Sequence, residues 1–298
     1  MYSTPSTEPA APAPAGRPLR IALPNKGSLS QSASDMLREA GYRQRLDAKE
    51  LALTDPENGV EFFYLRPRDI ALYVGEGTLD VGITGRDLLL DSGAKAEEVT
   101  PLGFGGSRFR FAARPGTAST LADLSGLRIA TSYAGVVRGY LEEHGIDATV
   151  TRLDGAVETS IQLGVADVIA DVVETGSTLR QAGLEVFGEV ILESEAVLVT
   201  RAGTGLPEGF EIFRRRLDGV LVARTYVMMD YDVPAHVVED AVELTPGIES
   251  PTVSPLHREG WFAVRSMVPR AGAQKLMDDL FDLGARGILL TDIHACRL

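Results

Sequence analysis

The sequence predicts an α/β protein: a unit of two lobes, followed by a smaller C-terminal module. Three observations lead to this prediction. Short β-rich runs alternate with helically spaced segments from residue 19 to residue 190, as expected for a mainly parallel sheet. Two apolar β-rich stretches over 187–200 interrupt the alternation before an amphipathic helix at 210–222. Residues 224–298 then follow the order βαββαβ, which is typical of the ferredoxin-like arrangement.

The first lobe is predicted to comprise residues 19–113 and 191–223. Its first helix has apolar residues at helical spacing and is followed by Gly41, a residue that suits a helix C-terminus. Pro67 stands where a second helix begins, a position that proline tolerates. Turns at 24–28 and 82–87 connect strands to helices. The expected strands are 19–23, 60–65, 79–84 and 108–113, and the expected helices are 29–40, 68–74 and 86–91.

The second lobe is predicted to comprise residues 114–190. Its helix at 136–144 is ended by Gly145, and a further helix begins at 179–182. The stretches over 187–200, broken at Glu193-Ser194-Glu195, should cross back to the first lobe. Two lobes joined by crossing strands form a cleft, as in periplasmic binding proteins. The expected strands are 127–131, 148–153 and 167–173.

The C-terminal module is predicted to comprise residues 224–298. A small module of this kind after a catalytic unit is often regulatory, and the alternative is a domain that only packs or oligomerises. The expected strands are 224–231, 251–255, 261–267 and 287–293, and the expected helices are 235–244 and 271–283.

The first 18 residues are rich in Ala, Pro, Ser and Thr and contain no apolar core of a secretory signal, so we expect a disordered tail. No apolar run in the sequence approaches the roughly 20 residues that span a bilayer, so no membrane association is expected. Cys296 is the only cysteine, which fits a cytoplasmic protein. The four histidines lack ligand spacing, so no metal site made by the protein alone is predicted.

The formal net charge is −13, which argues against general nucleic-acid binding because that relies on lysine and arginine. A polyanionic small substrate is still compatible, since the local field in a cleft decides its binding. Several basic residues do lie near loop motifs: Lys26, Lys49, Arg66, Arg68, Arg86, Arg108 and Arg110.

The segment 158–179 is the most informative part of the chain. An apolar strand at 167–173 runs directly into Thr175-Gly176-Ser177-Thr178, after which a helix can begin. Such a turn offers backbone N–H groups and hydroxyls to an anion. Two upstream carboxylates, Glu158 and Asp171, suit sugar hydroxyls or a metal carried by a second phosphate group. The segment therefore predicts a phosphorylated sugar as ligand. The plain alternative is a strand–turn–helix with an ordinary N-cap.

This segment resembles the signature of the ATP phosphoribosyltransferase family. The positions that match are Glu158, Gly164, Ala166, Ile169, Asp171, Val172, Thr175, Gly176, Thr178 and Leu179. Blocks at 20–27, 65–70, 82–88, 128–133 and 154–158 are similar to the family as well, so the resemblance covers nearly all of 19–298. The βαββαβ module makes the chain similar to the long form, which carries its own regulatory domain.

The resemblance implies a reaction in which N1 of the adenine of ATP attacks C1 of phosphoribosyl pyrophosphate, as the first step of histidine biosynthesis. Glu158 and Asp171 would hold ribose hydroxyls. Asp154 would assist them, and the alternative is that it is a solvated loop residue. The turn Thr175, Gly176, Ser177 and Thr178 would hold the 5-phosphate. Mg²⁺ would arrive on the pyrophosphate. No Ser–His–Asp or Cys–His set is visible, so covalent catalysis by the protein is not suggested.

Lys26 and Arg66 are the candidates for stabilising the pyrophosphate that leaves, while Arg68 is as well explained as a surface residue. Asp87 and Tyr133 would lie near the nucleotide, although Tyr133 could simply pack in the core. The C-terminal module is expected to bind L-histidine as a feedback inhibitor, and the family implies a homo-oligomer, either a dimer or a hexamer. The candidate histidine residues are Asp232, Ile248, Ser250, Thr252 and Gly287, for which turn and packing roles are the alternative.

Two other function classes compete. A solute-binding protein would share the two-lobed cleft but would bind an anion without chemistry; the absence of a secretory signal and the paired carboxylates argue against it. A regulatory or scaffold protein with an inactive site is the other alternative. The filled positions Glu158, Asp171, Thr175 and Thr178 argue against that interpretation.

Overall fold

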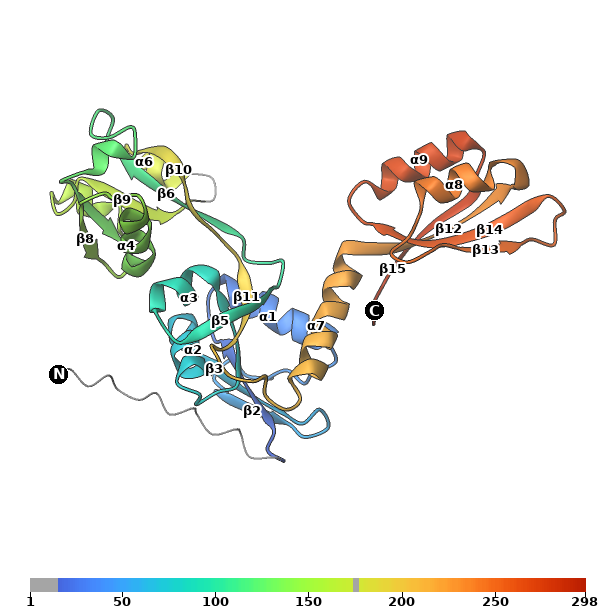
Figure 1. Ribbon diagram of the computed structural model, residues 1–298, viewed down its shortest axis with the longest axis horizontal. Helices are drawn as coiled ribbons and strands as arrows, with labels where there is room; N and C mark the ends of the chain where they lie inside the picture. The colour runs from blue at the N-terminus through green and yellow to red at the C-terminus, as the bar shows by residue number, and fades with distance from the viewer. Residues whose placement is uncertain (1–15, 174–176) are drawn as a thin grey trace, which may run out of the picture. The chain divides into compact units, whose positions relative to one another are not determined.

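The computed structural model describes residues 16–173 and 177–298, with the side chains of Ser177 and Thr178 left out of the description. The chain divides into two compact units, one formed by the residues up to Asp35 with Arg43–Phe210, the other by Met36–Tyr42 with Glu211–Leu298. Figure 1 shows the elements of both. Of the predicted tail, only the last residues are described, and there Arg17 forms an ion pair with Asp80 at 2.6 Å.

The first sheet has the order β2-β3-β1-β4-β11-β5. Its centre is parallel, since β1 pairs in parallel with β3 and β4, whereas β2, β11 and β5 are antiparallel to their neighbours. The prediction of a mainly parallel sheet is therefore correct only for β3, β1 and β4. The strands are β1 (Leu19–Pro24), β2 (Ala52–Asp55), β3 (Val60–Leu65), β4 (Val81–Gly85), β5 (Ala96–Pro101) and β11 (Ala196–Arg201).

Three helices accompany this sheet within one or two residues of their expected bounds: α1 (Ser28–Glu39), α2 (Pro67–Gly75) and α3 (Arg86–Ser92). Helix α2 packs very closely on β4, because a Cβ built on Gly82 would approach Cγ2 of Ile70 to 2.5 Å. Glycine at this position thus lets α2 lie close to the sheet. The N-terminus of α2 lies beside the carboxyl end of β3, because only Arg66 separates the two elements.

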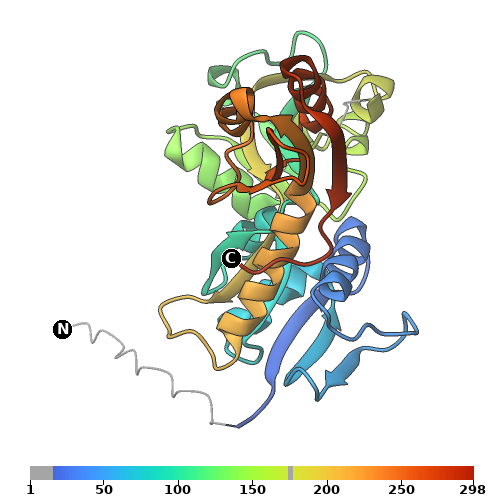
Figure 2. The ribbon, with the colours of Figure 1, turned by 90° about the vertical axis from the view of Figure 1, so that its right-hand side faces the viewer.

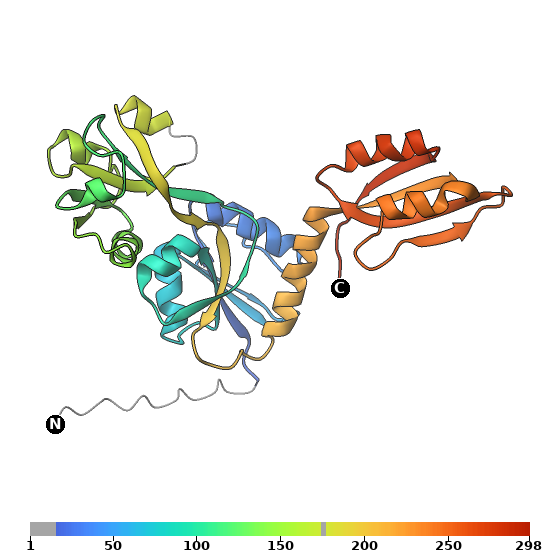
Figure 3. The ribbon, with the colours of Figure 1, turned by 45° about the horizontal axis from the view of Figure 1, so that its top comes forward.

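The second sheet has the order β10-β6-β9-β7-β8, in which β9, β7 and β8 are parallel to one another, whereas β6 and β10 are antiparallel to their neighbours. Figure 3 shows the chain crossing between the two sheets twice, after β5 and again from β10 into β11, as expected. The elements of this lobe are β6 (Ser107–Ala113), β7 (Arg128–Thr131), β8 (Thr149–Arg152), β9 (Val168–Val172), β10 (Glu185–Ser194), η1 (Ala122–Leu124), α4 (Ala134–Glu143), α5 (Thr159–Gln162) and α6 (Ser177–Gln181).

The second unit contains an antiparallel sheet of order β13-β14-β12-β15 with α8 and α9 on one face, which confirms the ferredoxin-like prediction (Figure 1). Helix α7 extends to Thr225, so Arg224 is helical and not the start of a strand as predicted. The elements are α7 (Phe210–Thr225), β12 (Tyr226–Pro234), η2 (Ala235–Val237), α8 (Val238–Leu244), β13 (Thr252–Pro255), β14 (Trp261–Pro269), α9 (Ala273–Leu283) and β15 (Arg286–Asp292).

The C-terminal segment after β15 returns to α7 (Figure 2), where the carbonyl of Cys296 lies directly against Gly219. Any side chain at position 219 would collide with that carbonyl, so this glycine allows the segment to contact the helix. Across the part of the chain that the structure describes, no helix combines the length and the apolar character needed to cross a bilayer.

Candidate active site

A cavity of about 730 Å³ lies at the carboxyl ends of the parallel strands of both sheets. Residues that follow β1, β3 and β4 line it from the first sheet, and residues that end or follow β7, β8 and β9 line it from the second. In open α/β sheets, ligands bind outside the carboxyl ends of the strands, because the loops and helix N-termini there present free N–H groups. The strand order of the fold therefore assembles this site.

The structure brings five of the predicted residues together around this cavity. They come from five different strand-to-helix connections: Lys26, Arg66, Asp87, Tyr133 and Asp154. Val172 lines the cavity, whereas its neighbour Asp171 and the upstream Glu158 do not. The predicted phosphate turn is only partly described, since Thr175 and Gly176 lie outside the described residues, and Ser177 and Thr178 begin α6 without described side chains.

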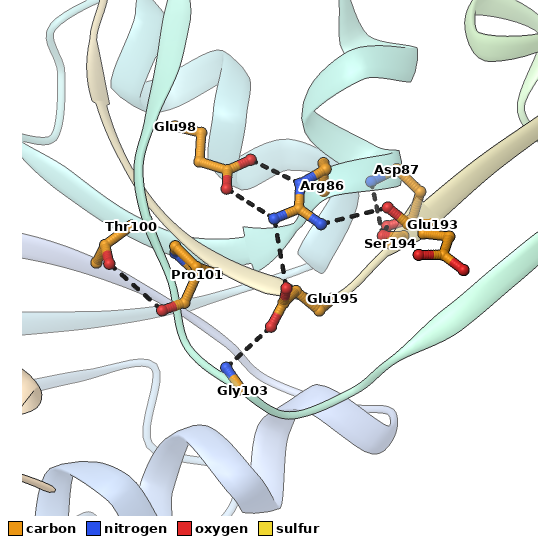
Figure 4. Close-up of polar contacts among 9 residues, drawn as sticks. All are labelled: Arg86, Asp87, Glu98, Thr100, Pro101, Gly103, Glu193, Ser194 and Glu195. Atoms are coloured by element: carbon orange, nitrogen blue, oxygen red, sulfur yellow. Dashed lines mark hydrogen bonds and ion pairs between the residues drawn. The ribbon is translucent and has the colours of Figure 1, made fainter. Parts of the chain in front are cut away.

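Asp87 is held firmly at the start of α3, with 8% of its surface exposed. Its backbone N–H donates to Oγ of Ser194 at 2.9 Å, and that hydroxyl donates in return to Oδ1 of Asp87 at 3.0 Å (Figure 4). The carboxylate also lies directly over Gly85, where no Cβ would fit. Ser194 ends β10, so the strand that crosses between the lobes fixes a side chain at the cavity wall. Sequence reasoning did not single out Ser194 for this role.

Tyr133 is half-buried, and its ring contacts Arg68 of the first lobe and Phe109 of the second. Burial raises the pKa of its phenol, and the charge of Asp87 raises it further, while Arg68 acts in the opposite direction. The ring packs edge-on against Phe109, with centroids 4.7 Å apart. Tyr133 thus packs in the core and also lines the cavity, and its place near a nucleotide stays a prediction.

Arg68 contributes more to the site than its sequence position indicated. Its guanidinium carbon lies 4.6 Å from the centroid of the Tyr133 ring, within the range of a cation–π contact. An ion pair of 3.2 Å links it to Asp91. The motif R-P-R-D contains the signal, because the two arginines flank the proline that begins α2, yet sequence alone does not show that both line the cavity.

Asp171 carries a carboxylate on β9 that the fold makes costly to ionise. Burial raises its pKa, and the nearby Glu158 raises it further, while a 2.8 Å hydrogen bond from the N–H of Val172 opposes both effects. Among the described contacts it has no arginine or lysine partner. Two acidic groups placed together in this way are suited to accept hydrogen bonds from neutral donors such as sugar hydroxyls.

Asp154 is exposed at the tip of the loop between β8 and α5. Gly155 and Ala156 follow with φ angles of +82° and +47°, and for alanine the left-handed region is a strained conformation. Ser132 steadies this loop, because its Oγ accepts the N–H of Gly155 at 3.2 Å and donates to the carbonyl of Leu153 at 2.8 Å. The loop therefore turns sharply to hold Asp154 at the cavity and Glu158 beside α5.

The cavity carries both signs of charge. Lys26, Arg66 and Arg68 offer cations to phosphate groups, while Asp87 and Asp154 offer acceptors to hydroxyl or amino groups. Within residues 16–173 and 177–298, no group of three or more His, Cys, Asp or Glu side chains could hold a metal ion. The arrangement fits a ligand with several phosphates and sugar hydroxyls.

A second polar cluster, formed by Arg86, Glu98, Glu195 and Gly103, joins the two crossing segments (Figure 4). The guanidinium of Arg86 donates to both carboxylate oxygens of Glu98 at 2.8 and 2.7 Å and lies 3.5 Å from Glu195. The hydrogen bond to Glu98 is the main reason that the pKa of Arg86 is raised. Glu195 also accepts the N–H of Gly103 at 3.0 Å. The cluster therefore connects the start of α3, β5 and both crossings.

The predicted histidine residues lie in two groups. Asp232 of β12 and Gly287 of β15 are neighbours, since a Cβ on Gly287 would be 3.6 Å from Oδ2 of Asp232. Ile248, Ser250 and Thr252 precede or begin β13, and β14 separates β13 from β12. Two strand spacings amount to roughly 10 Å. The structure thus makes Asp232 and Gly287 neighbours, whereas Thr252 begins a strand two places away from β12 in the sheet.

Comparison with protein families gives two matches. The family model for ATP phosphoribosyltransferase matches residues 66–218, and the model described as the HisG C-terminal domain matches residues 223–295. The first match contains most of the cavity wall, and the second coincides with the ferredoxin-like module.

Individual proteins agree with these matches. An ATP phosphoribosyltransferase of Streptomyces avermitilis is 67% identical over 94% of this chain and 100% of its own length. That of Streptomyces coelicolor is 65% identical with the same coverage. Among solved structures, an ATP phosphoribosyl transferase (HisG:HisZ) complex from Thermotoga maritima is similar, with a TM-score of 0.58 and 25% identity over 68% of this chain and 98% of that chain.

Proposed function

The chain belongs to the ATP phosphoribosyltransferase family, and from this premise we propose that its cleft joins ATP to phosphoribosyl pyrophosphate. As a member of this family, the chain is a pentosyltransferase that catalyses the first step of histidine biosynthesis. In the proposed reaction, N1 of the adenine attacks C1 of the ribose, the C1–O bond to pyrophosphate breaks, and N1-(5-phospho-β-D-ribosyl)-ATP forms with inversion. The nucleophile comes from ATP, so the protein has to align two polyanions and stabilise the charge that leaves.

The phosphoribosyl group is placed on the second lobe. Its 5-phosphate would bind the segment Thr175 to Thr178, at the N-terminus of α6, and its ribose hydroxyls would donate to Glu158 and Asp171. The raised pKa of Asp171 supports this placement, because a carboxylate that lacks a cation in the described structure is left with acceptor capacity for a ligand. Asp154, at the cavity wall, would add a further acceptor.

ATP is placed against Asp87 and Tyr133. Both line the cavity, and both are held by neighbours before any ligand arrives, which lowers the entropic cost of binding. The aromatic ring offers an apolar surface to a base, and the carboxylate offers an acceptor to an amino group or a ribose hydroxyl. ATP would thus meet the ribose across the cleft.

Lys26 and Arg66 would stabilise the pyrophosphate as its negative charge develops. Both lie at carboxyl ends of adjacent strands of the first sheet and line the same cavity. A guanidinium fork can contact two phosphate oxygens at once, which is why Arg66 is placed at the leaving group. Mg²⁺ would enter as part of the substrate, bound to the pyrophosphate, and would neutralise part of the same charge.

The observation that carries the proposal is the convergence of Lys26, Arg66, Asp87, Tyr133 and Asp154 on one cavity in a chain of this family. The test is an assay with ATP, phosphoribosyl pyrophosphate and Mg²⁺ that follows pyrophosphate release and the ultraviolet absorbance change together. We expect release only when both substrates are present. Release without ATP, or none with both substrates, would contradict the proposal.

Regulation and assembly form a separate proposal. The C-terminal module would bind L-histidine as a feedback inhibitor at Asp232 and Gly287, with Ile248, Ser250 and Thr252 completing the pocket. The chain would form a homo-oligomer, a dimer or a hexamer, and act in the cytoplasm. Exposed apolar residues on the outer strands, Val253 and Leu289, support a further interface. Light scattering on the purified protein tests the assembly, and a monomer at micromolar concentration would exclude it.

A further inference from the structure

Asp91 occupies a position at the end of α3 where the two lobes touch. Its side chain is 4% exposed, and its Oδ1 accepts the N–H of Gly135 at 2.7 Å. Gly135 belongs to the first turn of α4, in the second lobe, while α3 belongs to the first. The carboxylate of Asp91 thus ties the start of one helix to the end of another across the edge of the cleft.

Two arginines meet the other oxygen of the same carboxylate. Nη1 of Arg68 lies 3.2 Å from Oδ2 of Asp91, and Nη2 of Arg152 lies 3.8 Å from it. Arg68 lines the active-site cavity, whereas Arg152 does not. A buried carboxylate with one short backbone hydrogen bond and one close guanidinium has little freedom to rotate, so it fixes the Arg68 side chain as well.

The approach of the two helices is unusually close at this point. A Cβ built on Gly135 would lie 2.6 Å from the carbonyl oxygen of Asp91 and 3.1 Å from its Cα. Only glycine permits this separation without a shift of the backbone. The contact therefore rests on two sequence features, the carboxylate at 91 and the missing side chain at 135.

Tyr133 lies just before Gly135, and it is the residue over which Arg68 stacks at 4.6 Å. Asp91 thus acts on both partners of that stack, since it holds Arg68 through the ion pair and Tyr133 through the first turn of α4. We infer that Asp91 is a positioning residue for the phosphoribosyl transfer: it orients Arg68 and Tyr133 at the nucleotide side of the cleft without touching a substrate. This inference rests on the proposed placement of ATP.

The test is a double-mutant cycle of Asp91→Asn with Arg68→Ala, measured as kcat/KM for ATP and for phosphoribosyl pyrophosphate. Asparagine keeps an oxygen for the N–H of Gly135 but removes the charge that holds Arg68. We expect Asp91→Asn alone to lower kcat/KM for ATP by about tenfold and to change that for phosphoribosyl pyrophosphate much less. In the Arg68→Ala background the same substitution should change kcat/KM by less than about twofold, because its target is gone.

Arg152→Ala is the matched control, because Arg152 meets the same carboxylate outside the cavity. Its kcat/KM should stay within about twofold of the wild type. Equal losses from Asp91→Asn in both backgrounds would show a merely structural role and overturn the inference, as would an unchanged kcat/KM. If Asp91→Asn does not fold, Asp91→Glu, which keeps the charge but displaces it, serves in the same cycle. A wild-type enzyme inactive on ATP would instead contradict the proposed function.

Discussion

The carboxyl group of Asp171 is buried, and burial disfavours its charged form. The proposed binding of ribose hydroxyls uses this group, so the same residue that serves function costs stability when it is charged. Its folded-state pKa is raised by burial, so the stability it contributes is present below the ordinary pKa and is lost as pH rises through the raised value. Asp167, just before the same strand, shows the opposite case. Hydrogen bonds from Arg128 lower the pKa of Asp167, so its contribution is present above the ordinary pKa and lost as pH falls.

The first prediction follows from this contrast. At pH 8, Asp171→Asn should raise the unfolding midpoint by roughly 1–3 °C, because it removes a desolvated charge, and it should raise the KM for phosphoribosyl pyrophosphate. The gain should shrink as the pH is lowered from 8 through the raised pKa of Asp171. Asp167→Asn is the matched control and should lower the midpoint. Scanning calorimetry across this pH range checks both, and a loss of stability in Asp171→Asn at pH 8 would contradict the account.

A second prediction concerns Arg66, which is exposed in the free enzyme. If its guanidinium meets charge that develops on the leaving pyrophosphate, Arg66→Ala should lower kcat by about tenfold or more, with a smaller effect on the KM of either substrate. Steady-state kinetics with both substrates varied distinguishes this from simple binding. A raised KM with an unchanged kcat would place Arg66 in ground-state binding instead.

At the scale of elements, the crossings between the two sheets are joined by the Arg86 cluster. The side chain of Arg86 is 23% exposed and donates two hydrogen bonds to the carboxylate of Glu98. In the nearby pair of Arg108 and Glu193, both side chains are largely exposed. Lysine cannot reproduce the two parallel hydrogen bonds of a guanidinium. We therefore expect the crossings to depend on Arg86 and hardly at all on Arg108.

The third prediction is that Arg86→Lys lowers the free energy of unfolding by about 1 kcal/mol. Arg108→Lys should change it by less than about 0.5 kcal/mol, because exposed ion pairs contribute little. Denaturant titration of both variants measures the difference. Equal effects would show that the fork at Arg86 adds nothing beyond a surface charge.

The elements also show where sequence reasoning succeeds and fails. Strands β1, β3 and β9 are apolar runs, so their pattern predicted them nearly to the residue. Strands β2 and β5 were missed, because they lie at the edges of the sheet and are half-exposed, and β5 begins Ala-Glu-Glu. An edge strand needs only one pairing neighbour and little burial, so its sequence carries little of the usual signal.

The candidate site followed a similar rule. Residues in recognisable strand-to-helix turns, such as Lys26 and Asp87, were predicted and line the cavity. Ser194 and Asp91 were missed, because their roles depend on contacts with Asp87 and Gly135 that are distant in the sequence. A single sequence gives local patterns, whereas tertiary partners appear only once the sheets are assembled.

At the scale of the whole molecule, the fourth prediction concerns regulation. L-Histidine should lower the initial rate of the wild-type enzyme, and Asp232→Asn should weaken this inhibition by about tenfold or more while leaving the uninhibited rate unchanged. Asp230→Asn is the matched control, since Asp230 lies two residues away and is already paired with Arg265 at 2.6 Å. Equal loss of inhibition in both variants would argue against a specific contact at Asp232.

The most direct test of the central claim is a crystal structure of the enzyme soaked with phosphoribosyl pyrophosphate and Mg²⁺. We expect the 5-phosphate on the segment that follows Val173, the ribose hydroxyls within hydrogen-bond distance of Glu158 and Asp171, and the pyrophosphate toward Lys26 and Arg66. Density for the sugar phosphate at any other place, with the cleft between the strand ends left unfilled, would contradict it.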